Sequence, residues 1–180
     1  MHQTRRVFTS LLSIIVLSFA IVSPSTLAKP DTGPKDKVTL LQTALAVSAQ
    51  TGDFNTLIAA VLAADPSVVM LLSDNGQHTV FAPNDEAFAA LGLTSDNVGD
   101  LDQETLTTIL AYHVVKGRHL AEDVLASDKL NTLLKGKGGF LQQSGGALTD
   151  NLDRTANIVI TDVTASNGVI HAIDAVVLSE

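Results

Sequence analysis

The side chains that could do chemistry are few, and their spacing does not assemble a catalytic set. The five histidines, of which His78, His113, His119 and His171 lie beyond the N-terminal segment, include no pair at the i, i+4 spacing that would hold a metal ion on one helix. The chain has no cysteine, which excludes disulfides, thiolate metal sites and thiol nucleophiles. No acid–base pair or nucleophile set can be assembled from the remaining residues. We therefore expect no enzymatic activity, no metal site and no cofactor.

Three further segments contain residue types of known sites but lack the rest of each pattern. Residues 136–138 (GKG) have no Lys-Ser/Thr at phosphate-loop spacing, and Ser144 has no nucleophile-elbow motif. An acidic stretch lacks the glycine and the terminal glutamate of a calcium loop. Acidic residues at helix starts, together with a solvated loop, explain this stretch better. Its members are Asp96, Asp100, Asp102 and Glu104.

Helical periodicity dominates the first half of the chain. Apolar residues recur at i, i+3, i+4, i+7 and i+8 from Phe54 to Leu62, and Asp53 is placed to cap the first turn of this helix. Asn84 and Asp102 precede two later helices as N-cap residues. The other helices are expected over 40–47, 66–72, 85–91, 103–111 and 121–126.

Strands are expected mainly in the second half. Residues 78–81 form one early strand, and glycines punctuate short segments after residue 128, as in a β-meander. Residues 158–160 and 169–178 are apolar enough to predict buried, central strands, joined by a two-residue turn at Asn167-Gly168. Because helices come first and strands later, without βαβ alternation, the pattern predicts an α+β fold.

Three separated segments together resemble a known family. Residues 79–91 (TVFAPNDEAFAAL) resemble the first signature of fasciclin-like domains, and residues 109–117 (ILAYHVVKG) look like its Tyr-His segment. Residues 167–178 (NGVIHAIDAVVL) are similar to the closing signature, in the family's order and spacing. The resemblance covers residues 38–180 and implies a wedge-shaped β-sandwich flanked by N-terminal helices. It also implies that the first and last signatures are neighbouring strands, in a secreted bacterial single-domain protein.

The resemblance draws attention to Tyr112 and His113, the pair most often tied to adhesion in this family. One interpretation makes them part of a partner-binding surface. The other gives them a structural role, with the His113 ring hydrogen-bonded near the first signature, to Asp85, and Tyr112 packed as a bridge. We favour the structural interpretation because buried polar side chains usually serve to satisfy hydrogen bonds.

The remaining motif residues also suit a structural role. Pro83 and Asn84 stand where a strand ends and a helix begins, and Asp85 lies in the first turn of that helix, against its dipole. His171 sits inside an apolar strand, where a hydrogen-bonded core histidine is expected rather than a ligand. Asp174 punctuates the same strand.

The N-terminus has the three parts of a cleavable signal peptide over residues 1–28. Arg5 and Arg6 supply the positive region, residues 11–22 the apolar run, and small residues precede a cleavage site after Ala28. The competing interpretation is an uncleaved anchor, but the run is shorter than the roughly 20 residues that span a bilayer. The paired arginines also approximate a twin-arginine signal, which leaves that export route open beside the general secretory (Sec) route.

A polar leader rich in Pro and Gly follows at residues 29–37, and no second apolar span is present. The mature product is therefore expected to be free of an integral membrane anchor, whether it is secreted, periplasmic or held at the cell surface. The net charge is −8, and loss of the signal peptide with its two arginines leaves −10. Such a charge disfavours nucleic acid and anionic lipid as partners.

Two functions follow from these observations. The first, implied by the resemblance, is a non-catalytic adhesion module of the extracellular matrix or cell surface that recognises a protein or an extracellular polymer. The alternative is a carrier of an apolar small molecule such as a carotenoid or lipid, weakened by the scarcity of aromatic residues: six Phe, one Tyr and no Trp. One basic cluster, Lys129, Lys135 and Lys137, is where an acidic partner would be sought.

Overall fold

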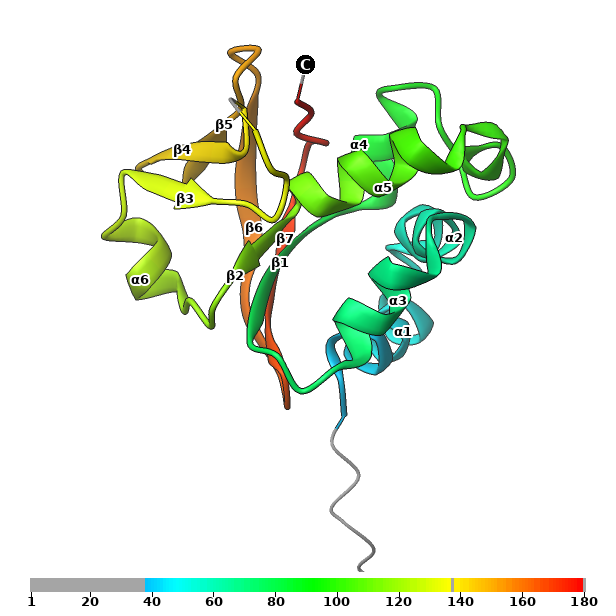
Figure 1. Cartoon of the computed structure of the whole chain (residues 1–180), viewed down its shortest axis with the longest axis horizontal. Helices are drawn as coiled ribbons and strands as arrows, with labels where there is room; N and C mark the ends of the chain where they lie inside the picture. Colours follow the sequence, from blue (N-terminus) through cyan, green and yellow to red (C-terminus); the bar gives the residue numbers. More distant parts are fainter. Residues whose placement is uncertain (1–37, 137, 180) are drawn as a thin grey trace, which may run out of the picture. The chain divides into compact units, whose positions relative to one another are not determined.

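The computed structural model describes residues 38–136 and 138–179 (Figure 1). The expected signal peptide (1–28), its cleavage site after Ala28 and the leader (29–37) lie outside the described residues, as does Lys137. The internal contacts define a compact unit over Asp36–Glu180.

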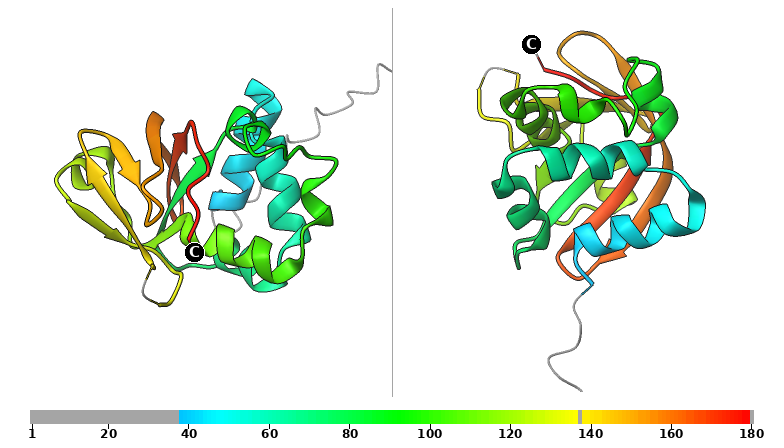
Figure 2. Two further views of the ribbon diagram at one scale, coloured as in Figure 1. Left: turned by 90° about the horizontal axis from the view of Figure 1, so that it is seen from above. Right: turned by 90° about the vertical axis from the view of Figure 1, so that its right-hand side faces the viewer.

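Helices occupy the positions that the apolar periodicity predicts. The helices are α1 (Leu40–Thr51), α2 (Asn55–Ala63), α3 (Pro66–Ser73), α4 (Asp85–Ala89), α5 (Gln103–Tyr112) and α6 (Ala121–Leu125), with a 3-10 turn η1 (Val98–Asp100). Helices α1–α5 lie on one side of the central strands, and α6 lies on the other (Figures 1 and 2). The predicted caps Asn84 and Asp102 are confirmed, because their side chains accept hydrogen bonds from the amides of Ala87 and Thr105.

The predicted cap of α2 is wrong. Asp53 does not cap this helix; the N-cap residue is Phe54, which has a left-handed backbone with φ of 71° and no capping side chain. Phe54 is buried, with 5% of its surface exposed. Because its ring must enter the core at the point where the chain turns into α2, packing sets the conformation here rather than a local cap.

Seven strands form one mixed sheet in the order β2-β1-β7-β6-β5-β4-β3. β1 and β7 run parallel, from His78 opposite Gly168 to Pro83 opposite Ile173, so the first and last signatures are neighbours as the resemblance implies. β3 to β6 form the predicted antiparallel meander. The strands are β1 (His78–Pro83), β2 (Val114–Lys116), β3 (Lys129–Asn131), β4 (Phe140–Ser144), β5 (Ala147–Thr149), β6 (Thr155–Ala165) and β7 (Gly168–Ile173).

The sheet bends so that its two outer strands approach each other. A single bridge joins Val115, in β2, to Thr132, just after β3, and the amide of Leu133 donates to the carbonyl of Val114 at 2.7 Å. One apolar cluster, which includes Phe81 and Tyr112, fills the inside of this bend, and a second lies between the sheet and helices α1–α5. The α+β class is confirmed, whereas the two layers of the expected β-sandwich belong to one continuous sheet.

β6 departs from the prediction of a buried strand. Val159 is 54% exposed and Ile160 is 43% exposed. β5 pairs only with residues 155–157, and beyond the hydrogen bond from the amide of Ile158 to the carbonyl of Gly146 no described strand pairs with β6 on that side. Two register shifts against β7 and a left-handed residue, Asp162 with φ of 60°, interrupt the strand in this region. An apolar composition therefore did not guarantee burial.

The β6–β7 hairpin is confirmed, but its two-residue turn lies one residue earlier than predicted, at Ser166-Asn167. Gly168 already belongs to β7, and a Cβ there would lie 1.9 Å from the carbonyl oxygen of His78 on β1. Close approach of the parallel strand therefore requires the glycine, rather than turn geometry.

Candidate functional site

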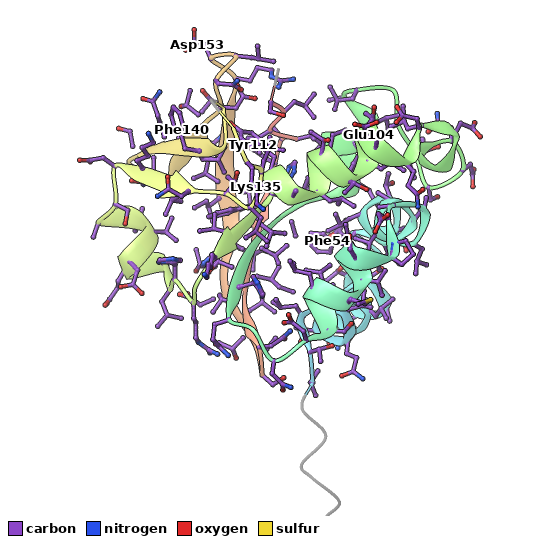
Figure 3. All side chains as sticks on the ribbon, viewed as in Figure 1. Phe54, Glu104, Tyr112, Lys135, Phe140 and Asp153 are labelled. Atoms are coloured by element: carbon purple, nitrogen blue, oxygen red, sulfur yellow. The ribbon has the colours of Figure 1, made fainter. Side chains whose placement is uncertain are left out.

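Tyr112 ends α5 and is completely buried, so its ring faces protein rather than solvent. Its hydroxyl donates to the carbonyl of Phe140 on β4 at 2.9 Å, which links the helical layer to the meander (Figure 3). Burial raises the pKa of Tyr112, and the nearby charge of Asp150 adds to this effect. The phenol is therefore neutral and acts as a hydrogen-bond donor between two layers.

His113 follows directly and is 2% exposed. Its Nδ1 lies 2.8 Å from the carbonyl of Ile109, which can only accept, so Nδ1 carries the proton. Burial lowers the pKa of His113 to about 4, against the opposing effects of the Ile109 carbonyl and the charge of Asp150. The neutral ring then presents an unprotonated Nε2, which has no hydrogen-bond partner among the described residues.

The predicted hydrogen bond between His113 and Asp85 is wrong, because Asp85 binds the start of α2. Its Oδ1 accepts from the amide of Thr56 at 2.8 Å, and its Oδ2 accepts from the amide and the side chain of Asn55 at 3.2 and 3.1 Å. Burial alone would raise the pKa of Asp85, but these hydrogen bonds outweigh it and hold the pKa below its usual range. Asp85 thus caps α2 from a distant part of the sequence.

In Figure 3, Tyr112 lies toward β4 and Phe140, and Phe54 lies among the helices. Neither Tyr112 nor His113 is accessible to a partner in this structure. The geometry favours the structural interpretation of the pair, and direct partner binding by these two rings stays a prediction.

His171, in β7, is fully buried and uses both ring nitrogens. Nδ1 accepts from the amide of Asp162 at 3.2 Å, so Nε2 carries the proton and donates to the carbonyl of His119 at 3.0 Å. The carboxylate of Asp162 in turn accepts from the amide of Ala121, at the start of α6. The histidine therefore joins the irregular part of β6 to the segment that leads into α6.

The motif residues at the far ends of β1 and β7 also bond within the fold. Pro83 pairs with Ile173, and the amide of Asn84 donates to the Ile173 carbonyl at 3.1 Å. The carboxylate of Asp174 accepts from the amide and the side chain of Asn157 at 2.7 and 2.9 Å, which ties β7 to the start of β6.

Two buried polar residues were missed as structural centres. Asp150, 1% exposed, accepts from the amides of Leu152, Arg154 and Leu178 and pairs with the Arg154 guanidinium at 2.8 Å. No periodicity marks an aspartate in a loop as a hub of this kind. Asn167 was identified only as a turn residue, although Asn-Gly at a strand end also fits a side chain turned back into the fold.

Asn167 joins three elements through a side chain that is 3% exposed. Its Oδ1 accepts from the amide of Leu40, at the start of α1, at 2.7 Å. Its Nδ2 donates to the carbonyls of Leu72 and Asp74, at the end of α3, at 3.0 and 2.9 Å. The β6–β7 turn is therefore fastened to both helices.

The predicted acidic stretch is spread over exposed positions near η1 and α5, where Asp102 serves as the cap of α5. Within the described part of the chain, no group of three or more His, Asp or Glu side chains is arranged to hold a metal ion. Among the same residues, no single helix is long and apolar enough to span a membrane; α2 and α3 reach the length only as a pair bent by 118°.

The basic cluster lies on the β3–β4 hairpin, which we call the basic hairpin and define by Lys129, Lys135 and Phe140. Both lysines are exposed. The Nζ of Lys129 lies 3.6 Å from the centre of the Phe140 ring, a cation–π contact that holds the ammonium group over the hairpin. This hairpin presents positive charge on a chain whose net charge is −8.

Comparison with known proteins finds similar sequences. A family model described as the fasciclin domain matches residues 52–179. Protein sll1483 of Synechocystis sp. is 40% identical over 138 residues, which are 76% of this chain and 73% of that protein. Transforming growth factor-beta-induced protein ig-h3 of Sus scrofa is 37% identical over 129 residues, which are 71% of this chain and 18% of that protein.

Among solved structures, a FAS1 domain pair from the insect cell adhesion molecule Fasciclin I covers 77% of this chain and 45% of its own, with 21% identity and a TM-score of 0.47. The family model spans most of the described residues, including all three segments that carry the resemblance. The chain belongs to the fasciclin domain family.

Proposed function

We propose that this protein is a secreted or cell-surface adhesion module that binds an extracellular protein or polymer without catalysis. Membership of a family in which many proteins act in adhesion supports this function. The motif side chains Asp85, Tyr112 and His171 bond to other parts of the fold, and the last two are fully buried. Recognition then falls to residues outside these motifs.

The basic hairpin is the surface that we propose for this contact, and one observation carries the choice. Lys129 and Lys135 are exposed on a chain whose net charge is −8, so this hairpin offers an acidic partner a local concentration of positive charge. Phe140 adds a half-buried ring beside the charges. The partner is therefore an acidic polymer or an acidic protein segment.

Binding to immobilised polygalacturonate, with neutral dextran as the reference surface, tests the proposal. The double variant Lys129→Ala/Lys135→Ala should bind about fivefold more weakly, since two exposed charge contacts contribute roughly 0.5 kcal/mol each. The matched control, Lys116→Ala/Arg118→Ala, removes two positive charges elsewhere and should bind like the parent. Raising the salt concentration should lower the affinity of the parent protein for polygalacturonate toward that of the double variant.

Equal losses in the two double variants would show that net charge alone acts and would contradict the assignment to the hairpin. Deletion of the gene in the native host tests the adhesion function independently of the basic hairpin. The deletion should reduce attachment or aggregation of the cells. Unchanged attachment, with no partner recovered by crosslinking, would contradict the adhesion function itself.

The alternative carrier function finds little room in the described residues. The apolar cavities between the helices and the sheet measure about 30 and 20 Å³. Pockets that enclose drug-sized ligands measure roughly 300–1,000 Å³. A carotenoid or lipid would need a large displacement of α1, and purified protein from the native host should show no visible absorbance.

A further inference from the structure

The chain contains two Asn-Gly pairs, Asn75-Gly76 and Asn167-Gly168. In such a pair the backbone nitrogen of the glycine can attack the side-chain carbonyl carbon of the asparagine. Glycine favours this attack because it has no Cβ to hinder the approach and its backbone turns easily. Asparagine counts among the chemically labile residues of proteins. Because the same pair occurs in two different surroundings, the fold decides which of the two reacts.

Asn75-Gly76 lies in the loop between α3 and β1. Asn75 is exposed, and Gly76 is half-buried. The amide of Gly76 donates to Oδ1 of Asp74 at 2.7 Å, and the Asp74 side chain is 52% exposed. A hydrogen bond at the surface of a loop opens readily to water. The Gly76 nitrogen is therefore within reach of solvent and available for the attack.

Asn167-Gly168 has the opposite surroundings. Asn167 is buried, and its side chain makes three hydrogen bonds, one to the start of α1 and two to the end of α3. Gly168 belongs to β7 and is held between β1 and β6. To reach the nitrogen of Gly168, the carboxamide of Asn167 would have to break all three hydrogen bonds. The fold therefore protects this second pair.

We propose that Asn75 is a site of spontaneous deamidation and that the fold protects Asn167 from the same reaction. The Gly76 nitrogen forms a bond to Cγ of Asn75, the bond from Cγ to Nδ2 breaks, and the amide proton leaves with the side-chain nitrogen as ammonia. Water then opens the cyclic succinimide at either of its two carbonyl carbons. One opening gives aspartate, and the other gives isoaspartate, in which the main chain runs through the side-chain carbon. Water is the only co-reactant, and the site does not depend on the basic hairpin or on the adhesion function.

The loop is short and held at both ends, which gives the modification a structural effect. The carbonyl of Asp74 accepts from Nδ2 of Asn167 at 2.9 Å, and the carbonyl of Gln77 accepts from the amide of Gly117 at 2.8 Å. Isoaspartate inserts one extra carbon into the main chain between these two points, whereas aspartate does not. Both products add one negative charge to a chain whose net charge is −8. We expect the isoaspartate form to be the less stable of the two.

Incubation of the purified protein at mildly alkaline pH, in water enriched in heavy oxygen, tests the proposal. Peptide mass mapping then measures the labelled product at each Asn-Gly pair. In the folded protein Asn75 should react about 100-fold faster than Asn167, because each of the three hydrogen bonds at Asn167 corresponds to about a fivefold factor in rate. In guanidinium chloride, where the fold is absent, the two pairs should react at similar rates.

Variants at exposed positions test the location and the structural effect. Asn75→Gln has a side chain that is too long to close the same ring, and it should abolish the rapid appearance of a more acidic form on anion exchange. Asn131→Gln is the matched control at an exposed asparagine that no glycine follows, and it should leave that rate unchanged. Asn75→Asp adds the charge without the extra carbon and should melt like the parent, whereas the isoaspartate fraction should melt at a lower temperature.

Four outcomes would overturn the proposal. The first is a reaction at Asn167 in the folded protein as fast as that at Asn75. The second is a reaction at Asn75 only after denaturation, which would show that the loop holds the pair in an unreactive conformation. The third is an acidic form that appears in Asn75→Gln at the parent rate, which would place the modification elsewhere. The fourth is an isoaspartate fraction that melts like Asn75→Asp, which would remove the structural effect.

Discussion

At the scale of single residues, His113 has the strongest consequence because it is neutral and buried. Its pKa of about 4 in the folded protein lies below the ordinary value of 6.5. As the pH falls below 6.5, the imidazole of His113 binds a proton in the unfolded chain but not in the folded chain. The free energy of unfolding therefore declines toward pH 4. Above pH 6.5 this contribution is fully present.

We therefore expect the free energy of unfolding to fall by about 3 kcal/mol between pH 6.5 and pH 4, from the pKa difference. Urea denaturation at a series of pH values measures this slope, and His113→Phe should lose most of it. Asp85 has a lowered pKa, so its contribution fades only at more acidic pH. A parent protein equally stable at pH 6.5 and pH 4 would contradict the prediction.

Asp85 gives a second prediction, in which the sequence and the structure disagree. Asp85→Ala should destabilise the protein by about 1–2 kcal/mol, because the first amides of α2 lose their acceptor. Asp53→Ala, at the position that the sequence pattern favours as the cap, should change stability by less than about 0.5 kcal/mol. The urea midpoints of the two variants measure the two losses of stability. A larger loss in Asp53→Ala than in Asp85→Ala would contradict the observed geometry.

At the scale of elements, the β6–β7 turn fastens α1 and α3 to the sheet through one amide group. Asn167→Asp keeps the acceptor for Leu40 but brings a carboxylate against the carbonyls of Leu72 and Asp74. We expect a loss of about 2–4 kcal/mol, the cost of two donors and an unpaired buried charge.

Asn84→Asp is the matched control for Asn167→Asp. The side-chain oxygen of Asn84 caps α4, and aspartate caps a helix equally well. Thermal unfolding should therefore leave Asn84→Asp unchanged while Asn167→Asp melts at a lower temperature. Similar melting temperatures for both variants would mean that the Asn167 amide contributes little.

Strand burial is also decided between elements. Val159 and Ile160 are as apolar as the residues of β7, yet they are exposed, in the part of β6 that lies beyond its pairing with β5. Composition indicates which residues prefer burial, but the layers that pack against the faces of the sheet determine which of them are buried.

At the scale of the whole molecule, β7 lies in the middle of the sheet although it comes last in the described chain. It pairs with β1 across 90 residues, from His78 to Gly168, and with β6 on its other side. The described sheet cannot be completed before the C-terminal strand is available. This dependence predicts slow folding, because many of the native contacts join residues that are distant in the sequence.

Truncation tests this dependence on the C-terminus. A chain that ends at Asn167 should show no cooperative unfolding transition, because the parallel partner of β1 is missing. A chain that ends at Leu178 keeps β7 and the amide that donates to Asp150, so it should unfold like the full protein. Circular dichroism against temperature compares the two, and cooperative unfolding of the shorter chain would contradict the prediction.

The sequence by itself determined the helices, the meander, the hairpin, the family and the caps at Asn84 and Asp102. The helices and caps depend on periodicity and on hydrogen bonds between residues three or four apart, the meander and hairpin on turn residues, and the family on three short motifs, so local patterns contain all of them. The relation of the first and last signatures was known only through the resemblance.

Only the tertiary structure decided where the motif side chains bond. Asp85 binds α2 instead of His113, His113 bonds within its own helix, and Asp150 and Asn167 join elements far apart in the chain. A polar side chain bonds to whichever partner the packing of helices and sheet brings within about 3 Å. The residues next to it in the sequence do not determine that partner.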